Sequence, residues 1–305
     1  MKSRIYLTGA SGRIGKAVLK KIPDAVPLVR NASGLENEIV VDFSDAEELK
    51  RILNDASVLV HIAGSVKTYD KKDLWEGNYG LTKKLLDALP ENARLVFAST
   101  ISVYGKNPVD VPADEGTPVN PDSEYAKSKY ESEKLAAEHP NHVILRIGVV
   151  YGPEFGDYFY ILGLLEKRKM KIIGDGDNRI SFVNVDDVAD VFVSALSKGS
   201  GIYVISGECR PQKEIYEIAC RELGVVPPKE SVSVGAADLA ARMGEIKAKL
   251  FGGKPKITRE HVAILSSGRC FNCNKARREL GFSPRSIEEG IAEMARIHKR
   301  SSTEP

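Results

Sequence analysis

The sequence is poor in cysteine, in tryptophan and in excess charge, and each shortage excludes a class of protein. Its 305 residues hold four cysteines and one tryptophan, and the formal net charge is +2. Four unevenly spread cysteines predict no disulfide framework of the kind that staples small secreted domains. A nearly balanced charge gives no global electrostatic basis for binding nucleic acid. Since no segment approaches the roughly 20 apolar residues that span a bilayer, and no signal peptide is visible, we expect a cytoplasmic protein with no membrane partner.

What the sequence does contain is a regular alternation of short apolar runs and helical patterns over its first half. Alternating strands and helices are typical of a parallel sheet that is covered by helices on both faces. The predicted strands are Ile5–Thr8, Ala25–Arg30, Ile39–Val41, Val58–Ile62, Arg94–Ser99 and His142–Ile147, and the predicted helices are Gly12–Lys21, Asp45–Leu53, Leu74–Leu89 and Tyr125–Glu138. The expected fold class is therefore α/β, with a doubly wound parallel sheet of the Rossmann type.

A glycine-rich segment, TGASGRIG at residues 8–15, follows the first predicted strand and opens the first predicted helix. Of Gly9, Gly12 and Gly15, one allows the tight turn, one admits a pyrophosphate close to the backbone, and one lets the helix pack on the sheet. The strand before and the helix after make this pattern far more specific than a glycine triplet alone. It predicts a dinucleotide-binding site, with an ordinary glycine-rich turn as the alternative.

The form of the dinucleotide depends on the end of the second predicted strand. A carboxylate there binds the adenosine ribose of NAD, whereas a cation favours the 2′-phosphate of NADP. This chain has Arg30 at that position, and we expect Arg13 of the glycine segment to point toward the same corner. Two guanidinium groups can clamp a phosphate; two solvated surface arginines are the alternative. Asp42, after the third strand, fits an adenine contact, so NADP is the expected cofactor, with NAD as the second choice.

Beyond Tyr151 the alternation weakens, and helix and loop patterns dominate. This change predicts a smaller, mostly helical C-terminal lobe over the carboxyl edge of the sheet, where ligands of doubly wound folds bind. We expect residues 1–152 to form a dinucleotide-binding domain to which residues 177–206 return. Residues 153–176 and 207–305 are then the substrate-binding lobe.

A tyrosine and a lysine four residues apart, Tyr125 and Lys129 in YAKSK, begin the fourth predicted helix and share one of its faces. A phenol is a poor acid or base at neutral pH because its pKa is about 10. A neighbouring ammonium group stabilises the phenolate and lowers that pKa. Upstream, FASTISVYG at residues 97–105 ends a strand and brings Ser99, Thr100 and Ser102 to the same edge of the sheet. These residues indicate acid–base chemistry at a substrate oxygen.

Together these motifs resemble those of the extended short-chain dehydrogenases/reductases, the NAD-dependent epimerase/dehydratase-like enzymes. The resemblance runs nearly from end to end, through nine segments in the order in which the family has them. They are TGASGRIG, VDFSD with Asp42, HIAG (61–64), EGNYGLTKKLLDAL with Asn78, ASTISVYG, YAKSK, LRIGVVYGP (145–153), GDGDNRISFVNVDDVAD (174–190) and KARRELGFSP (275–284). Within the family, the chain is most similar to the dihydroflavonol reductase and 3β-hydroxysteroid dehydrogenase branches.

The resemblance implies that Thr100, Tyr125 and Lys129 are the catalytic residues. The family's catalytic Ser or Thr lies four residues before the tyrosine of the VYG segment, which points to Thr100 ahead of Ser99 or Ser102. Thr100 would orient the substrate oxygen and Tyr125 would exchange its proton, while Lys129 would hold the nicotinamide ribose and lower the tyrosine pKa. The implied cofactor-binding residues are Gly9, Ser11, Gly12, Arg13, Ile14, Gly15, Arg30, Asp42, Phe43, Ala63, Gly64, Asn78, Tyr125 and Lys129.

Departures from the family's branches bear on the reaction. The 4,6-dehydratases carry an acidic pair after the catalytic threonine, and here Ile101 and Ser102 follow, so an acid and a base for dehydration are lacking. Nucleotide-sugar epimerases carry an asparagine where this chain has Val149, which cannot donate a hydrogen bond to a diphosphate. The compact segment 152–174 and the NADP-type Arg30 also favour an oxidoreductase that acts at a carbinol or carbonyl carbon.

Arg179 favours a different reaction. It matches an arginine that sugar-nucleotide enzymes use on the diphosphate, which makes it a predicted substrate-binding residue, although reductase branches keep it too. A nucleotide-sugar 4-epimerase acting on a UDP-hexose is therefore the main alternative. A non-catalytic, NADP-sensing regulator is a third hypothesis; it is disfavoured because such proteins typically lack the tyrosine or the lysine, and both are present here.

The substrate lobe is the least informative part of the sequence. Tyr158, Phe159, Tyr160 and residues 231–256 are candidate pocket walls, but nothing there separates a sugar from a polycyclic alcohol. Cys270 and Cys273 have the spacing of half a zinc site without a second pair, so we expect structural cysteines and no metal. Related enzymes often dimerise through helices that flank the sheet, and residues 74–89 and 125–138 are the candidates for a homodimer.

Overall fold

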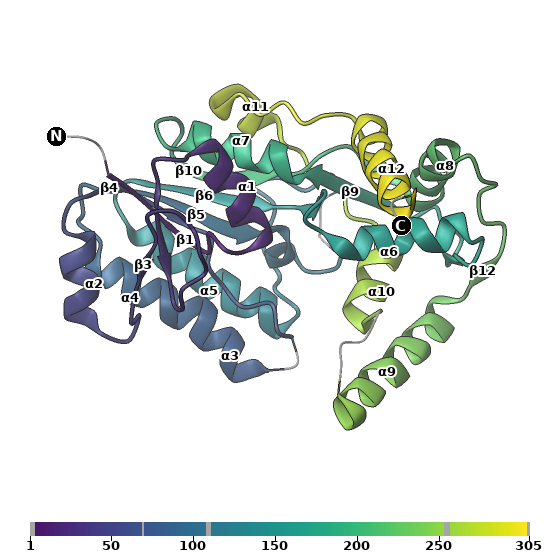
Figure 1. The fold of residues 1–305 in the computed structure, drawn as a ribbon, viewed down its shortest axis with the longest axis horizontal. Helices are drawn as coiled ribbons and strands as arrows, with labels where there is room; N and C mark the ends of the chain where they lie inside the picture. The colour runs from purple at the N-terminus through teal and green to yellow at the C-terminus, as the bar shows by residue number, and fades with distance from the viewer. Residues whose placement is uncertain (1–3, 69, 108–110, 253–256, 304–305) are drawn as a thin grey trace.

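The centre of the molecule is a parallel sheet (Figure 1). The computed structural model describes residues 4–68, 70–107, 111–252 and 257–303. Its seven strands lie in the order β10-β6-β5-β4-β1-β2-β3, and all adjacent pairs are parallel. They are β1 (Arg4–Thr8), β2 (Val26–Val29), β3 (Ile39–Val40), β4 (Ala56–His61), β5 (Arg94–Thr100), β6 (His142–Ile147) and β10 (Gly201–Ile205). The order reverses between β1 and β4, which is where such folds bind ligands. The predicted doubly wound sheet is confirmed.

Each inner strand is buried on both faces, because consecutive side chains point to opposite sides of the sheet. Tyr6 and Leu59 lie in one apolar core, while their neighbours Leu7 and Val60 lie in the other. All four side chains are almost fully buried. This two-sided burial explains why the strands read as continuous apolar runs in the sequence.

Helices cover both faces of this sheet (Figure 1), with α1, α7 and α11 on one side and α2, α3, α4 and α5 on the other. The pairs α1 and α7, α2 and α4, and α4 and α5 pack against each other. Their bounds are α1 (Arg13–Lys21), α2 (Ala46–Leu53), α3 (Lys71–Trp75), α4 (Leu81–Ala88), α5 (Glu124–Glu138), α7 (Val185–Ala195) and α11 (Asn274–Leu280). Because these helices cover the faces of the sheet and not the carboxyl ends of its strands, that edge can border a ligand site.

The C-terminal lobe packs beside that edge and contains mainly helices. Its helices are α6 (Gly156–Glu166), α8 (Gln212–Leu223), α9 (Val234–Phe251), α10 (Arg259–Ser266) and α12 (Ile287–Thr303). Two small sheets complete it, β11-β9-β7 and β12-β8, built from β7 (Val149–Tyr151), β8 (Ile172–Ile173), β9 (Arg179–Asn184), β11 (Cys209–Pro211) and β12 (Ser231–Val232). Helices α6, α8 and α12 enclose an apolar core of their own. The domain boundaries drawn from the sequence stay a prediction.

Two local features differ from the sequence prediction. The single helix expected over 74–89 is three pieces, because a π-helical turn, η1 (Glu76–Gly80), separates α3 from α4. The sequence predicts no disulfide framework, but it does not reveal that one disulfide is present: Cys209 of β11 is bonded to Cys270, with their Cα atoms 5.4 Å apart. The Cys273 thiol donates a hydrogen bond to the carbonyl of Ser206 instead. In the described part of the chain, no group of three His, Cys, Asp or Glu side chains could hold a metal ion.

Candidate active site

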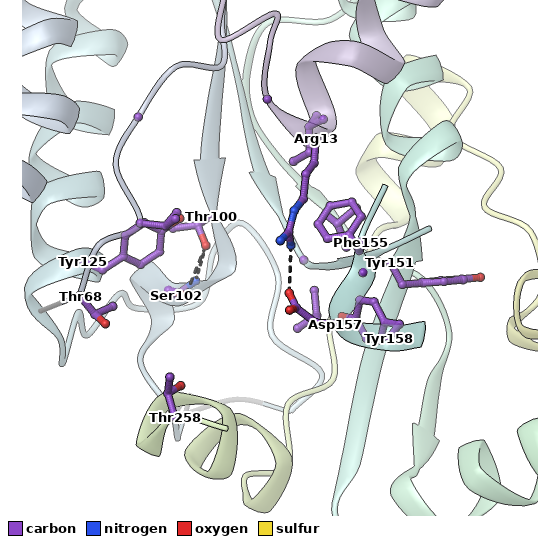
Figure 2. A pocket seen from close by; sticks show the side chains of 18 of the residues that line it. Arg13, Thr68, Thr100, Ser102, Tyr125, Tyr151, Phe155, Asp157, Tyr158 and Thr258 are labelled. Atoms are coloured by element: carbon purple, nitrogen blue, oxygen red, sulfur yellow. Dashed lines mark hydrogen bonds and ion pairs between the residues drawn. The ribbon is translucent and has the colours of Figure 1, made fainter. Parts of the chain in front are cut away.

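A large cavity of about 1640 Å³ runs from the carboxyl ends of β1 and β4 into the C-terminal lobe. One end of it is bordered by the glycine segment, the middle by Thr100 and Tyr125, and the far end by side chains of α6, α8, α10 and α12. Figure 2 shows the middle of this cavity, with the residues of the sheet edge on one side and those of α6 on the other. The predicted cofactor and catalytic residues thus meet at one site.

The glycine segment forms a cradle that a side chain would fill. Gly9 has φ +77°, and a Cβ atom there would lie 2.6 Å from the backbone nitrogen of Ala63. A Cβ atom on Gly15 would lie 2.0 Å from the carbonyl oxygen of Gly9, so α1 can approach β1 this closely only with glycine. Helix α1 begins at Arg13, after the N-cap Gly12, with neither a side-chain cap nor an acidic residue in its first turn. These features fit a dinucleotide, because the helix start offers N–H groups and a positive dipole end to a pyrophosphate.

The two arginines predicted to flank the adenosine end are directed differently. Arg30 directly follows β2 and lines the cavity with Asp42 and Phe43. The Arg13 side chain instead crosses to α6, where Nη1 lies 3.1 Å from Oδ2 of Asp157 and the guanidinium covers the ring of Phe155. Figure 2 shows this contact. The expectation that Arg13 and Arg30 point toward the same end of the site is therefore not met, because Arg13 contacts Asp157 of α6 and the ring of Phe155, which directly precedes α6.

Thr100 and Tyr125 reach the cavity from different elements that pack together. Thr100 ends β5, and its Oγ1 accepts a hydrogen bond from the Ser102 backbone nitrogen at 3.2 Å, which caps the 3₁₀ turn η2 (Ile101–Tyr104). Tyr125 lies in the first turn of α5, which Ser123 begins by accepting a hydrogen bond from the backbone nitrogen of Ala126. Helix α5 packs on β5 and η2. A hydroxyl and a phenol thus border the same space (Figure 2).

Lys129 lies just behind this wall rather than in it. Its Nζ donates a hydrogen bond of 2.6 Å to the carbonyl of Ala98 and lies 4.4 Å from the centre of the Phe97 ring. A Cβ atom on Gly64, which lines the cavity, would lie 4.0 Å from Nζ. Burial lowers the pKa of Lys129 to about 8, against the opposing effect of the Glu133 carboxylate. A buried ammonium one helical turn after Tyr125 can stabilise a phenolate.

Glu133 is a buried residue near the site that motif spacing does not single out. Its carboxylate accepts a hydrogen bond of 2.5 Å from Ser99 and forms an ion pair with Arg146, with Oε1 2.6 Å from Nη2. Arg146 also donates to the hydroxyl of Tyr104. All partners of this network are buried. It ties α5 to the end of β5, one residue before Thr100.

His61 and Asn78 serve the scaffold of the site. Thr8 Oγ1 lies 2.7 Å from Nδ1 of His61, and His61 Nε2 lies 3.0 Å from Thr82 Oγ1, which donates to the carbonyl of Asn78. Burial, followed by the charge of Lys129, lowers the pKa of His61 to about 3, so the ring is neutral. The Asn78 amide bonds Ser65 and Ser128 and does not line the cavity. A direct cofactor contact by Asn78 stays a prediction.

The far end of the cavity is mainly apolar, with Gln212, Tyr216 and Arg269 as polar members of its lining, and Arg179 is absent from it. The Arg179 side chain is directed to the carbonyl of Cys209, at 2.9 Å, rather than into the cavity. Of the predicted pocket aromatics, Tyr158 and Tyr160 line the cavity, whereas Phe159 stacks on His298. The described residues of 231–252 do not reach it, and 253–256 lie outside the described residues. Its apolar lining is Ile161, Leu162, Leu164, Leu165, Met170, Ile173, Ile180, Phe182, Ile215, Ala219, Leu265, Ile287, Ile291 and Met294.

The chain has relatives among enzymes of two kinds. A putative UDP-glucose 4-epimerase of Methanocaldococcus jannaschii is 28% identical over 72% of this chain and 82% of that protein. The decarboxylating sterol-4-alpha-carboxylate 3-dehydrogenase of Dictyostelium discoideum is 23% identical over 95% of this chain and 99% of that protein. No helix among the described residues is long and apolar enough to cross a membrane.

Solved structures share the fold over nearly the whole chain. A UDP-glucose 4-epimerase from Thermotoga maritima with UDP-glucose has a TM-score of 0.75 at 22% identity, over 99% of this chain and 100% of that one. A UDP-glucuronic acid 4-epimerase from Bacillus cereus in complex with NAD has a TM-score of 0.74 at 21% identity, over 98% and 99%. Residues 5–206, well over half of the chain, match one family description. The chain therefore belongs to the NAD dependent epimerase/dehydratase family, as its motifs predicted.

Proposed function

We propose that the protein is an NAD(P)-dependent oxidoreductase that transfers hydride at the carbinol or carbonyl carbon of an apolar substrate. One observation carries this proposal: the cavity that begins at the glycine segment passes Thr100 and Tyr125 and ends among mainly apolar side chains, with Gln212, Tyr216 and Arg269 as the polar members. A UDP-sugar needs polar partners for its diphosphate and its base. The two positions expected to supply them offer Val149 and an Arg179 that is directed elsewhere.

In the proposed reaction, the bound nicotinamide supplies or accepts the hydride, and the protein handles the proton. Thr100 Oγ1 holds the substrate oxygen by a hydrogen bond, and the Tyr125 hydroxyl gives that oxygen its proton during reduction. The Lys129 ammonium favours the phenolate that remains on Tyr125. The apolar side chains beyond hold the body of the substrate and exclude water, which strengthens these polar contacts.

A nucleotide-sugar 4-epimerase is the second candidate, because relatives such as the M. jannaschii protein are named as putative UDP-glucose 4-epimerases. The two functions differ in what the purified protein does with UDP-glucose. An epimerase converts it to UDP-galactose without added cofactor and keeps NAD⁺ through purification. The proposed oxidoreductase does neither and oxidises NADPH in the presence of an apolar ketone. Assembly as a homodimer and a cytoplasmic location stay predictions.

Tyr125→Phe is the direct test of the mechanism. Removing the phenolic proton should lower the rate of NADPH oxidation with an apolar ketone by roughly 100-fold or more, because general acid catalysis contributes about that much. Binding of NADPH should stay within a few fold, measured by fluorescence titration. Tyr130→Phe on the same helix, away from the cavity, is the matched control and should leave the rate unchanged. Turnover by Tyr125→Phe at nearly the wild-type rate would exclude this mechanism.

We also propose that NADP is the preferred cofactor, since Arg30 occupies the end of β2 where NAD-binding chains carry an acid. NADPH should then bind at least about tenfold more tightly than NADH, because a charge-assisted phosphate contact contributes about 1.5–3 kcal/mol. Arg30→Asp should remove most of that difference. Arg13→Ala should leave the ratio nearly unchanged, because Arg13 contacts Asp157. Equal affinity of the wild type for both cofactors would rule out this preference.

A further inference from the structure

Helix α9 carries its large apolar side chains on the outside of the molecule. Leu239, Met243, Ile246, Leu250 and Phe251, hereafter the α9 stripe, are between 49% (Ile246) and 80% (Phe251) exposed. The face of α9 that packs on α10 carries small residues instead, with Ala237 and Ala241 in contact with a small apolar cluster. A surface helix ordinarily has the opposite arrangement, with the large apolar residues toward the core. Figure 1 shows α9 at the lower edge of the molecule, beyond α10 and away from the sheet.

The α9 stripe is continuous along the helix. Its first four members are four, three and four residues apart, a spacing that keeps them on one face of an α-helix. Scattered exposed apolar residues need no explanation, but a contiguous exposed patch marks an interaction site. The α9 stripe is therefore a candidate interaction surface.

The charges around the stripe indicate what that partner is. In the sequence, residues 238–260 contain six basic residues and three acids, Asp238, Glu245 and Glu260, an excess of positive charge in a chain that is nearly neutral. Arg242 and Lys247 are exposed and lie beside the stripe on the helix. Of the six, Arg259 is paired with Asp238. The exposed cations Arg242 and Lys247 beside the stripe suit an anionic surface, which attracts them, better than a second copy of the same helix.

The stripe also lies near the cavity. Ile257, which is 41% exposed, and Thr258 lie just before α10, and with Leu265 of α10 they line the cavity. Helix α10 is the element on which α9 packs. An apolar molecule that leaves a lipid phase at the stripe is thus close to the apolar end of the cavity.

We propose that α9 docks this protein on the surface of an anionic lipid bilayer, with the α9 stripe in the boundary between headgroups and acyl chains. A helix with an apolar face and a basic flank binds in this way without spanning the bilayer. The expectation of no membrane partner came from the lack of long apolar runs, which excludes spanning helices only. Neither cofactor nor catalysis is needed for the docking, although the proposed apolar substrate gives it a purpose.

Sedimentation with vesicles tests this inference in the absence of cofactor and substrate, so its outcome is independent of the proposed reaction. The wild type should sediment with vesicles of 70% phosphatidylcholine and 30% phosphatidylglycerol, and much less with pure phosphatidylcholine. Salt at about 0.5 M should weaken the binding, because it screens the charge attraction. The triple variant Leu239→Ser, Met243→Ser, Leu250→Ser should lose more than about tenfold in vesicle affinity, because it removes three of the apolar side chains that would leave water on docking.

Two controls keep the test decisive. The three substituted side chains are all more than half exposed, so the triple variant should unfold at the wild-type temperature. Val226→Ser, an equally exposed apolar residue outside α9, should leave vesicle binding unchanged. The inference fails if the wild type ignores anionic vesicles or if the triple variant binds them equally well. It fails too if analytical ultracentrifugation finds a wild-type dimer that the triple variant cannot form, because a second copy then covers the stripe.

Discussion

At the scale of single residues, the charge of Lys129 is set by two opposed influences. Burial beside Phe97 and Ala98 disfavours the ammonium form and lowers the pKa of Lys129 to about 8. Glu133, one turn further along α5, acts in the opposite direction through its negative charge. Glu133 is itself held by Arg146 and Ser99. The carboxylate that anchors α5 to β5 therefore also helps to keep the neighbouring lysine charged near neutral pH.

This balance predicts a pH dependence of cofactor binding. If Lys129 holds the cofactor as proposed, NADPH affinity should fall as pH rises through about 8, where the lysine loses its proton. Glu133→Gln removes the charge that raises the pKa, so the fall should move to lower pH by about one unit. Fluorescence titration of NADPH between pH 6 and 9 measures both curves, with circular dichroism as the check on folding.

Comparing the two curves of NADPH affinity against pH separates an effect of Glu133 on the pKa of Lys129 from damage to the fold. Glu133→Gln also leaves Arg146 without its buried anion, which should cost about 3 kcal/mol or more in stability. A purely structural role would weaken NADPH binding equally at every pH. A pH midpoint that is the same in wild type and variant would contradict the assigned effect of Glu133 on Lys129.

The sequence predicts that a residue borders the cavity when this depends only on its position along a strand or helix. Gly9 and Thr100 lie at strand ends, and parallel strands bring their carboxyl ends to one edge. The direction of a long side chain depends instead on distant partners. Arg13 turns to Asp157 and Arg179 to the carbonyl of Cys209, and no local pattern announces either contact. Whether these residues bind cofactor or substrate stays a prediction.

At the scale of elements, buried strands were predictable and the details of helices were not. The strands of the sheet are apolar on both faces, so their runs stand out, and most observed bounds lie within a residue or two of the prediction. The segment η1, EGNYG, contains two glycines but no proline to end a helix. The apolar periodicity continues through it, so the sequence does not predict the change of helix type. For α9 the periodicity is visible, but sequence cannot tell that its large apolar face points outward. That orientation follows from the small residues that α9 presents to α10.

Two acidic residues lie at the start of α7. Asp186 and Asp187 lie in the first turn, after the cap Asn184, where carboxylates complement the helix dipole. Asp187 has a further role that spacing could not reveal. It accepts hydrogen bonds from the backbone and side chain of Arg285, nearly a hundred residues later, and so ties α7 to the segment before α12.

At the scale of the whole molecule, one covalent bond joins segments that are distant in the chain. Cys209 lies in β11, which pairs with β9, and Cys270 follows Arg269, whose backbone nitrogen donates to the carbonyl of Arg179 in β9. The two cysteines are 61 residues apart. Their proximity depends on the pairing of both segments with β9, so a count of cysteines could not reveal it.

Loss of this disulfide should destabilise the protein without preventing cofactor binding. Closing a loop of 61 residues restricts the unfolded chain and contributes about 4 kcal/mol to stability in the chain-entropy treatment. The variant Cys209→Ser, Cys270→Ser should therefore unfold roughly 6 °C below the wild type, since about 1 kcal/mol corresponds to about 1.6 °C in a chain of about 300 residues. NADPH affinity should be retained, because the glycine segment belongs to the main sheet.

Reduction provides the control for that variant. Dithiothreitol should lower the unfolding temperature of the wild type toward that of the double serine variant and leave the variant itself unchanged. The other two cysteines are suited to this comparison: both are buried, and burial raises the pKa of the Cys273 thiol to about 11, so they react slowly with iodoacetamide. Alkylation under native, non-reducing conditions should therefore label almost no thiol, and labelling of Cys209 and Cys270 should require the reductant. Rapid labelling of those two cysteines without reductant, together with an unfolding temperature insensitive to dithiothreitol, would show that the bond does not form in solution.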